Sequence, residues 1–322
     1  MELSDDIIEK VKQLQEKYAA TGQDLNSYLE GLLYADYVKY WDYIQVDTLL
    51  SLQKPRTNFP DEIIFIMYHQ VTELYFKLSL HELEQLANKE DLTGEFLTVR
   101  LTRVNRYFEA LTKSFEIMIN GMEREQFLKY RMSLLPASGF QSGQYRKIEI
   151  ACANFLQLVE KDERHKFSSD YSEEDIPNMF EWIYWKKGAT ELESGKKTLT
   201  LIQFEEKYRD EFIALAKKLK NKNVWALYKG LPEAEQQKEE LILALRQLDI
   251  NVNVNWPLVH YKSAARYLQK DPMDIAATGG TNWQKYLPPR FQKRIFYPSL
   301  WSVKEIEDWG KGWVESVVRD LN

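Results

Sequence analysis

The sequence has 322 residues, and its 43 Lys and Arg residues against 49 Asp and Glu residues give a formal net charge of −6. This acidic balance argues against a nucleic-acid-binding protein, which needs a basic surface. The chain holds a single cysteine, Cys152, and four histidines, His69, His81, His165 and His260, which are too few for a cysteine-rich zinc site, an iron–sulfur cluster or a disulfide framework.

The first half of the chain has the periodicity of helices. Apolar positions recur at helical spacing over 5–34, 61–88 and 94–130. A proline and small residues within 134–139 indicate a loop. Ser138, three residues before Gln141, has the form of a capping box, so we expect the next helix to begin near Gly139 and to end near Glu160.

The second half is also helical in pattern. Residues 162–200 mix aromatic, acidic and basic side chains, and there we expect a partly irregular insertion with a short helix. Helical patterns resume at 201–220, 231–250 and 256–270, before a Gly-, Pro- and aromatic-rich tail at 276–302 and a last helix at 303–320. Because long helices recur and no run of alternating strands occurs, the sequence predicts an all-α fold.

The chain carries no targeting signal that we recognise. Residues 1–6 lack the basic and apolar regions of a signal peptide, and no run of about 18 apolar residues occurs. We therefore expect a cytoplasmic protein that does not interact with membranes. Cys152, in an apolar helical context, fits a buried residue in a reducing compartment.

His69 belongs to the apolar face of the helix expected at 61–88. Phe65 lies about 40° from it around the helix, and Phe76 falls between the two. A histidine on such a face is usually a hydrogen-bonded core residue, so the pattern alone favours that role over a ligand. His81 lies about 18 Å further along the axis, so the two histidines cannot share one metal ion.

His260 is the second histidine that could bind a ligand. It lies on one face of the expected helix with Trp256, Ala264 and Tyr267. A small residue beside a histidine allows a flat ligand to approach the helix. A five-coordinate heme needs one protein ligand and an apolar slot, so few histidines suffice for heme where they would not suffice for zinc. The pattern alone still favours a core histidine.

Two further features could bind an anion. The planar guanidinium of Arg131 could hold a carboxylate through two hydrogen bonds, although most arginines are solvated surface residues. The glycines of the segment 278–281, Thr-Gly-Gly-Thr, permit a small ligand to approach the backbone, although two adjacent glycines more often form a turn.

Four motifs together carry a family resemblance. They are residues 60–77 (PDEIIFIMYHQVTELYFK), residues 136–146 (PASGFQSGQYR), Trp256 four residues before His260, and the Thr-Gly-Gly sequence at 278–280. In this order they resemble the tryptophan 2,3-dioxygenase family, and with their flanks they extend from about residue 36 to residue 302.

The resemblance implies a large bundle-like single domain over 1–322 with heme b between its helices. It implies a ferrous heme enzyme that cleaves the indole C2–C3 bond of L-tryptophan with O2 to give N-formylkynurenine, the first step of tryptophan catabolism through kynurenine. It also implies an intertwined homotetramer, a dimer of dimers, without nucleic-acid partners.

Roles for single residues follow from the same resemblance. His260 would be the axial ligand of the heme iron with Trp256 beside it in the cofactor site. Ser138 and Gly139 would line the pocket on the opposite face of the heme. His69 would be the catalytic histidine there, which hydrogen-bonds the indole N–H and orients the ring.

The resemblance implies a substrate site around that histidine. Phe65 would pack against the indole, Arg131 would bind the substrate carboxylate, and Thr278 would contact the carboxylate and the ammonium group. Three residues of the N-terminal segment, which covers about 1–50, would reach into a neighbouring subunit's site: Tyr40, Tyr43 and Ile44.

Some positions depart from the family pattern. Phe127 stands where an aromatic hydroxyl is often found, Pro257 interrupts the helix that carries His260, and the insertion at 162–200 is unlike that of better-known members. Two alternatives therefore stay open. One is a related heme enzyme that adds a single oxygen atom to a substituted tryptophan or indole, and the other is a non-catalytic heme-binding helical oligomer.

Overall fold

The computed structural model describes residues 3–22, 24–35, 38–134, 141–189, 196–268 and 289–310. These residues are helical apart from turns and loops, and the only extended pairing among them is an isolated antiparallel bridge between Val159 and Ile183. The predicted all-α class is confirmed. The chain divides into two compact units, Met1–Gln53 and Lys54–Asn322. No helix in the described part is both long and apolar enough to cross a membrane.

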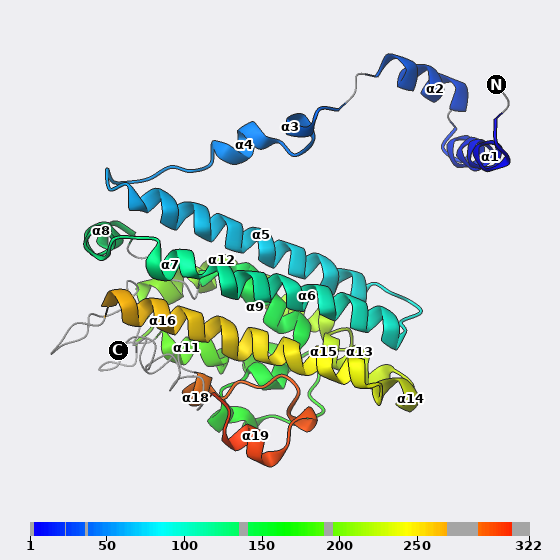
Figure 1. Ribbon diagram of the computed structural model, residues 1–322. Helices are drawn as coiled ribbons and strands as arrows, with labels where there is room; N and C mark the ends of the chain where they lie inside the picture. Colours follow the sequence, from blue (N-terminus) through cyan, green and yellow to red (C-terminus); the bar gives the residue numbers. More distant parts are fainter. Residues whose placement is uncertain are drawn as a thin grey trace. The chain divides into compact units, whose positions relative to one another are not determined.

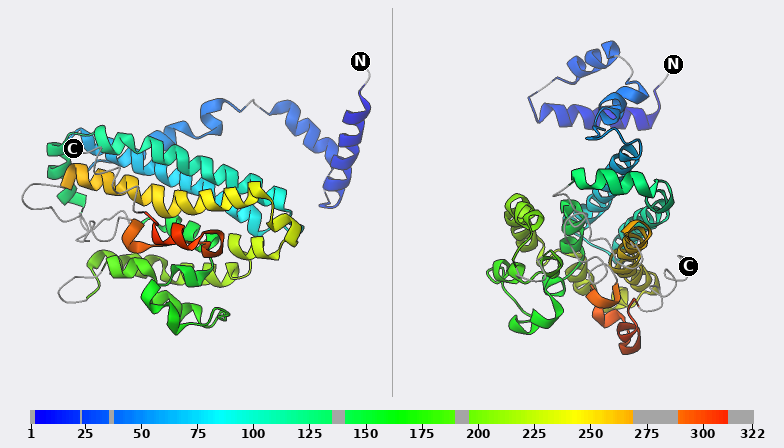
Figure 2. Two further views of the ribbon diagram at one scale, coloured as in Figure 1. Left: turned by 60° about the horizontal axis from the view of Figure 1, so that its bottom comes forward. Right: turned by 90° about the vertical axis from the view of Figure 1, so that its left-hand side faces the viewer.

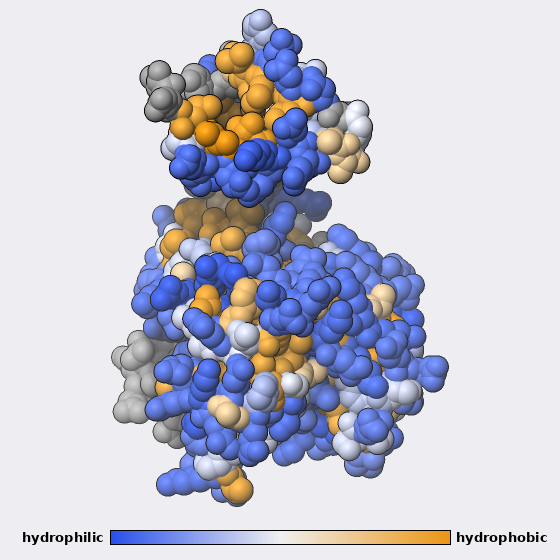
Figure 3. Space-filling model, turned by 90° about the vertical axis from the view of Figure 1, so that its right-hand side faces the viewer, coloured by the Kyte–Doolittle hydropathy of each residue, from blue (hydrophilic) through white to orange (hydrophobic). Residues whose placement is uncertain are grey.

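The N-terminal unit consists of four helices: α1 (Asp5–Ala19), α2 (Leu25–Tyr34), α3 (Tyr40–Tyr43) and α4 (Val46–Leu50). The helical pattern expected over 5–34 is broken where Gly22 adopts a φ of +70°, which side chains other than glycine rarely tolerate. Asp24 then caps α2 by accepting a hydrogen bond from the backbone N–H of Ser27 at 3.1 Å. Figure 3 shows apolar side chains gathered on one face of this unit.

The second unit opens with α5 (Asp61–Ala87), which confirms the long helix expected at 61–88. The single helix expected at 94–130 is instead α6 (Gly94–Ser114), α7 (Glu116–Asn120) and α8 (Arg124–Tyr130), followed by the 3-10 turn η1 (Arg131–Leu134). α7 ends at Gly121, where a Cβ atom would lie 2.4 Å from the carbonyl oxygen of Ile117. A larger residue would not fit at this position, and the helical periodicity of the sequence does not indicate this break.

The next helices are shorter than expected. α9 (Gly143–Cys152) begins after Ser142, whose hydroxyl accepts from the backbone N–H of Tyr145 at 3.2 Å. The helix ends at Cys152 rather than near Glu160, and Ser138 lies outside the described residues. Four short elements follow: η3 (Phe155–Leu158), η4 (Lys161–Lys166), α10 (Ile176–Glu181) and α11 (Tyr184–Gly188). The last three lie almost entirely in the 162–200 segment, in which we expected irregular chain with a short helix.

The last part of the unit contains α12 (Leu199–Leu219), α13 (Val224–Gly230), α14 (Glu233–Gln236), α15 (Glu239–Ile250), the π-helical turn η5 (Asn251–Asn255), α16 (Trp256–Leu268), α18 (Pro289–Gln292), η6 (Pro298–Leu300) and α19 (Val303–Glu307). The helix expected at 231–250 therefore begins at Glu239, after the separate short helix α14. The helix expected at 303–320 is described only as far as Glu307, because residues 311–322 lie outside the described part.

α6 is the central helix of this unit. It packs against α5 on one side and against α15 on another, while α9 packs against α5 and α12. Figures 1 and 2 show α5, α6 and the continuous rod of α15, η5 and α16 side by side. The buried face of α6 carries residues at helical spacing that are fully inaccessible to solvent: Leu97, Leu101, Val104, Phe108 and Leu111. The two candidate histidines lie on the helices that flank it.

Candidate active site

α5 sets the geometry of His69. Asp61 and Glu62 in its first turn favour the helix N-terminus. Four residues after Phe65, the His69 ring lies with its centroid 4.1 Å from the Phe65 ring, and its Nδ1 is 2.7 Å from the Phe65 carbonyl oxygen. Because a carbonyl oxygen only accepts, Nδ1 donates this hydrogen bond and Nε2 carries the free lone pair.

His69 lines a cavity of about 390 Å³. The cavity wall is formed by eight residues, from the segment before α5, from α5 itself and from η1: Lys54, Arg56, Glu62, Phe65, Ile66, His69, Gln70 and Leu134. The His69 ring is exposed to this hollow, yet it is surrounded by protein, and this burial lowers its pKa. The neutral form of the ring is therefore favoured at physiological pH.

Glu62 holds one wall of the cavity in place. Its carboxylate, 1% exposed, accepts from the backbone N–H of Arg56 at 2.8 Å and from both the N–H and the hydroxyl of Thr57, at 2.7 and 2.5 Å. Burial alone would raise the pKa of Glu62, but these hydrogen bonds outweigh it and lower the pKa. Sequence reasoning missed Glu62 and Arg56, because an acidic residue in a first helical turn already has an explanation there.

His260 has the same local geometry on α16. Its Nδ1 lies 2.9 Å from the carbonyl oxygen of Trp256, so Nε2 again carries the lone pair. The rings of Phe115 and Trp256 both have centroids 4.5 Å from the imidazole. The pKa of His260 is lowered to about 4, mainly by burial and in part by the nearby His69, while the hydrogen bond to the Trp256 carbonyl acts in the opposite direction. The imidazole is therefore neutral at physiological pH.

The two histidines form a donor set that fits heme. A heme needs one neutral imidazole as axial ligand, aromatic or apolar walls, and open space on the other face. His260 supplies such an imidazole between two aromatic rings, and His69 lies within electrostatic range of it. His69 lines the cavity, whereas His260 and Trp256 are not among the cavity-lining residues. Trp256, 6% exposed, packs against Phe115 and His260 in the core, which places it beside the expected ligand.

Arg131 is buried, with 7% of its surface exposed, at the start of η1. Burial lowers the pKa of its guanidinium. Two rings of the preceding helix lie near Phe65. The ring centroid of Tyr130 is 6.1 Å from that of Phe65, and the ring centroid of Phe127 is 6.3 Å from that of Phe65. Arg131 is thus in the neighbourhood of Phe65, although it is not one of the cavity-lining residues.

The remaining expected site residues belong either to the N-terminal unit or to segments outside the described residues. Tyr40 and Tyr43 are 73% and 79% exposed and Ile44 is 39% exposed, all in the N-terminal unit. Three others, Ser138, Gly139 and Thr278, lie outside the described residues.

Comparison with known proteins identifies the family. The model of the tryptophan 2,3-dioxygenase family matches residues 30–200, just over half of the chain. A tryptophan 2,3-dioxygenase of Bacillus anthracis is 30% identical over 274 residues, which cover 82% of this chain and 91% of that protein. One of Bradyrhizobium diazoefficiens is 26% identical over 274 residues, covering 84% and 92%.

Another relative has a higher sequence identity over a shorter stretch. The tryptophan 2,3-dioxygenase of Ruegeria sp. (strain TM1040) is 39% identical over 123 residues, which cover 38% of this chain and 43% of that protein. The match to this relative thus spans less than half of its length, whereas the matches to the Bacillus and Bradyrhizobium proteins span about nine tenths of theirs. The chain belongs to the tryptophan 2,3-dioxygenase family.

Proposed function

We propose that the chain is a heme-dependent dioxygenase that cleaves the indole C2–C3 bond of L-tryptophan with O2 to give N-formylkynurenine. The observation that carries the proposal is the matched pair of histidines. In both His69 and His260, Nδ1 is engaged by a carbonyl of the same helix at 2.7 and 2.9 Å, so each ring offers Nε2. Membership of the family supports the substrate.

His260 would hold heme b through Nε2, and its hydrogen bond to Trp256 would fix the tautomer and the orientation of the ring. When bound, heme supplies the iron that binds and activates O2. The protein has the task of holding the ligand neutral and aligned. The lowered pKa of His260 serves this task, because a protonated imidazole cannot bind iron.

His69 and Phe65 would position the indole. The Nε2 lone pair of His69 can accept a hydrogen bond from the indole N–H, and the adjacent Phe65 ring can pack against the apolar face of the indole. Arg131 would bind the substrate carboxylate, since a buried guanidinium pairs well with an anion. We expect Thr278 to complete the amino-acid site, with Ser138 and Gly139 lining the pocket. Fixing both ends of the substrate in this way lowers the entropic part of the barrier.

The N-terminal unit would supply the contact between subunits. Its helices expose large apolar side chains, of which Leu32 and Leu33 are 70% and 82% exposed, and Figure 3 shows such side chains gathered on one face. Apolar patches of this kind are typical of protein interfaces. With Tyr40 and Tyr43 in the same unit, we propose a homotetramer in which this unit contacts a neighbouring subunit's site.

Product analysis tests the proposal. The heme-loaded protein is reduced, mixed with L-tryptophan and O2, and the products are identified by mass. N-formylkynurenine supports the proposal. A product with one added oxygen atom supports the monooxygenase alternative instead, and the absence of product with any indole tested supports a non-catalytic heme protein.

Variants of the histidines separate their roles. His260→Ala is expected to lose heme or its ligation, whereas His69→Ala is expected to keep heme and lose most of the activity. His81→Ala is a matched control, because His81 is exposed on the same helix as His69. An unchanged heme spectrum in His260→Ala would refute the ligand assignment.

A further inference from the structure

The helix that carries His260 contains a π-helical turn. α15, η5 and α16 form one continuous rod from Glu239 to Leu268, and η5 occupies Asn251–Asn255. Within it, the N–H of Trp256 bonds to the carbonyl of Asn251, five residues back, and not to Val252 as in an α-helix. Pro257 follows at once and has no N–H to donate. The turn therefore leaves the Val252 carbonyl in need of a partner from outside the rod.

Two buried side chains outside the rod supply that partner. The hydroxyl of Tyr145, on α9, donates to the Val252 carbonyl at 2.8 Å, and the guanidinium of Arg294 donates to it at 3.3 Å. Arg294 also donates to the Tyr145 hydroxyl at 2.9 Å and, through Nε, to the side-chain oxygen of Asn253. Tyr145 and Arg294 are 7% and 4% exposed. We call these two residues the π clamp.

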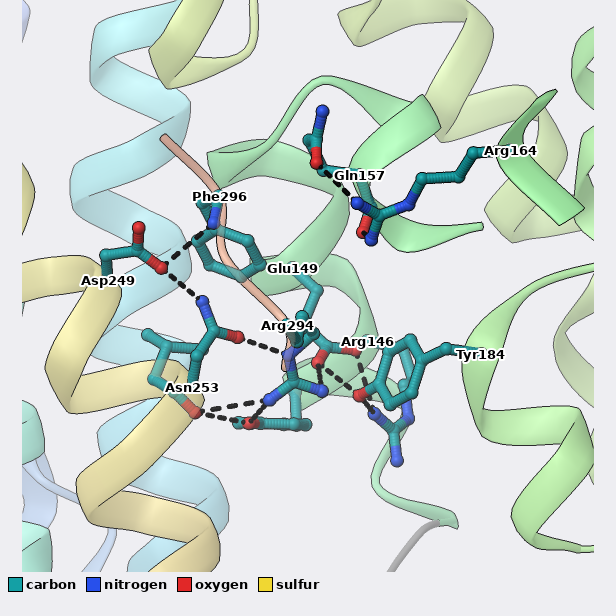
Figure 4. A network of polar contacts seen from close by, with 11 residues as sticks. Arg146, Glu149, Gln157, Arg164, Tyr184, Asp249, Asn253, Arg294 and Phe296 are labelled. Atoms are coloured by element: carbon teal, nitrogen blue, oxygen red, sulfur yellow. Dashed lines mark hydrogen bonds and ion pairs between the residues drawn. The ribbon is translucent and has the colours of Figure 1, made fainter. Parts of the chain in front are cut away.

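The π clamp is itself anchored on both sides (Figure 4). Arg294 pairs with the fully buried Glu149 at 2.6 Å, so its charge is compensated inside the protein. On the rod, Asp249 accepts from the side chain of Asn253 at 2.6 Å and from the backbone N–H of Phe296 at 2.9 Å. Arg294 and Phe296 lie in the same segment after α18, and this segment therefore contacts both the turn and the end of α15.

The turn determines which way α16 presents its side chains. A π-helical turn holds one more residue than an α-helical turn, and each residue of a helix advances about 100° around the axis and about 1.5 Å along it. If η5 relaxed to a regular α-helix, every side chain of α16 would rotate by roughly this angle relative to α15. His260 would leave its position beside Phe115, which is not part of α16 and would not rotate with it.

We propose that Tyr145 and Arg294 are positioning residues for His260: by holding the π-helical turn, they set the rotation of α16 that directs Nε2 of His260 toward the iron site. The inference rests on the proposed function in that it takes His260 as the iron ligand. Neither residue is one of those to which the proposed function gives a contact with heme or substrate.

Tyr145→Phe tests the clamp, because it removes one hydroxyl and keeps the ring. Tyr228→Phe is the matched control: Tyr228 is 6% exposed and its hydroxyl donates to a backbone carbonyl, that of Gln236, at 3.1 Å, away from the rod. The loss of one such hydrogen bond is expected to raise amide exchange around Val252 by about fivefold to tenfold in Tyr145→Phe. In Tyr228→Phe the exchange there is expected to be unchanged.

Two spectroscopic readouts follow His260 itself. In the full chain without added heme, the four histidines give four ring resonances in NMR, and only that of His260 is expected to move in Tyr145→Phe, since its ring lies beside Phe115. In the ferrous heme-loaded protein, the iron–histidine stretching band is expected to shift or broaden. Tyr228→Phe is expected to change neither.

The outcomes distinguish failure of the clamp proposal from failure of the proposed function. A fall in thermal stability with unchanged His260 resonance and unchanged iron–histidine band would mean that Tyr145 is merely structural, and would overturn the clamp. Absence of an iron–histidine band in the unaltered protein would overturn the assignment of His260 as iron ligand in the proposed function. In that case the His260 resonance and the amide exchange would still decide whether the π clamp positions His260.

Discussion

Replacing His260 with glutamine tests whether this imidazole is held neutral by burial. The pKa of His260 is lowered from 6.5 to about 4 in the folded chain. A difference of this size between folded and unfolded states corresponds to about 3 kcal/mol in the free energy of unfolding. Because the folded pKa lies below the unfolded one, the unfolded chain binds more protons between these two pH values. Stability therefore falls as the pH falls through this window, and the loss is absent above the unfolded pKa.

The assay is urea unfolding of the heme-free protein at several pH values across this window. We expect the unaltered protein to lose about 3 kcal/mol more than His260→Gln between neutral pH and the acid end of the window. Asp249, whose pKa is raised to about 6 mainly by burial, contributes with the opposite sign, but it does so in both proteins and drops out of the difference. His165→Gln, at an exposed position, is the control and should follow the unaltered protein. Parallel stability profiles for the His260 variant and the unaltered protein would refute the reasoning.

Three further substitutions, one of them with a matched control, have expected outcomes. Arg131→Ala should weaken apparent L-tryptophan binding by about 2–5 kcal/mol while heme stays bound, and an unchanged affinity would exclude Arg131 as the carboxylate partner. Glu62→Gln should lower the free energy of unfolding by about 1–3 kcal/mol, because a buried charged acceptor of three hydrogen bonds is lost; urea unfolding measures this, and a neutral effect would contradict the role given to Glu62. Gly121→Ala should cost about 1–3 kcal/mol through its contact with the Ile117 carbonyl. Gly230→Ala, which meets no atom within 4 Å, should be far milder, and equal losses in the two glycine variants would rule out the contact as the cause.

Much of the fold could be predicted because helical periodicity is local. The pattern from Asp61 to Ala87 runs without interruption, and α5 has these bounds. The breaks inside 94–130 could not be predicted in the same way. Phe115, which ends α6, is an apolar residue that fits the helical stripe, and it is buried against Trp256 and His260. Its backbone is still right-handed helical, with a φ of −62° and a ψ of −13°, so the break is a local distortion that the apolar pattern does not indicate.

The residues of the candidate site also differ in whether the sequence could predict them. His69 and His260 were recognisable through family motifs, and the local hydrogen bonds that fix their tautomers follow from helix geometry. Tyr145 and Arg294 act through partners that are far from them in the sequence. Tyr145 and Arg294 are 149 residues apart and form a hydrogen bond in the core. Only the three-dimensional structure brings such groups together.

The central claim is that the chain adds both atoms of O2 to L-tryptophan. The most direct measurement reacts the reduced, heme-loaded protein with L-tryptophan in a mixture of labelled and unlabelled O2 and analyses the product by mass. We expect N-formylkynurenine that carries either two labelled oxygen atoms or none, because both atoms come from one molecule of O2. A product with a single added oxygen atom, or unreacted tryptophan beside a fully heme-loaded protein, would contradict it.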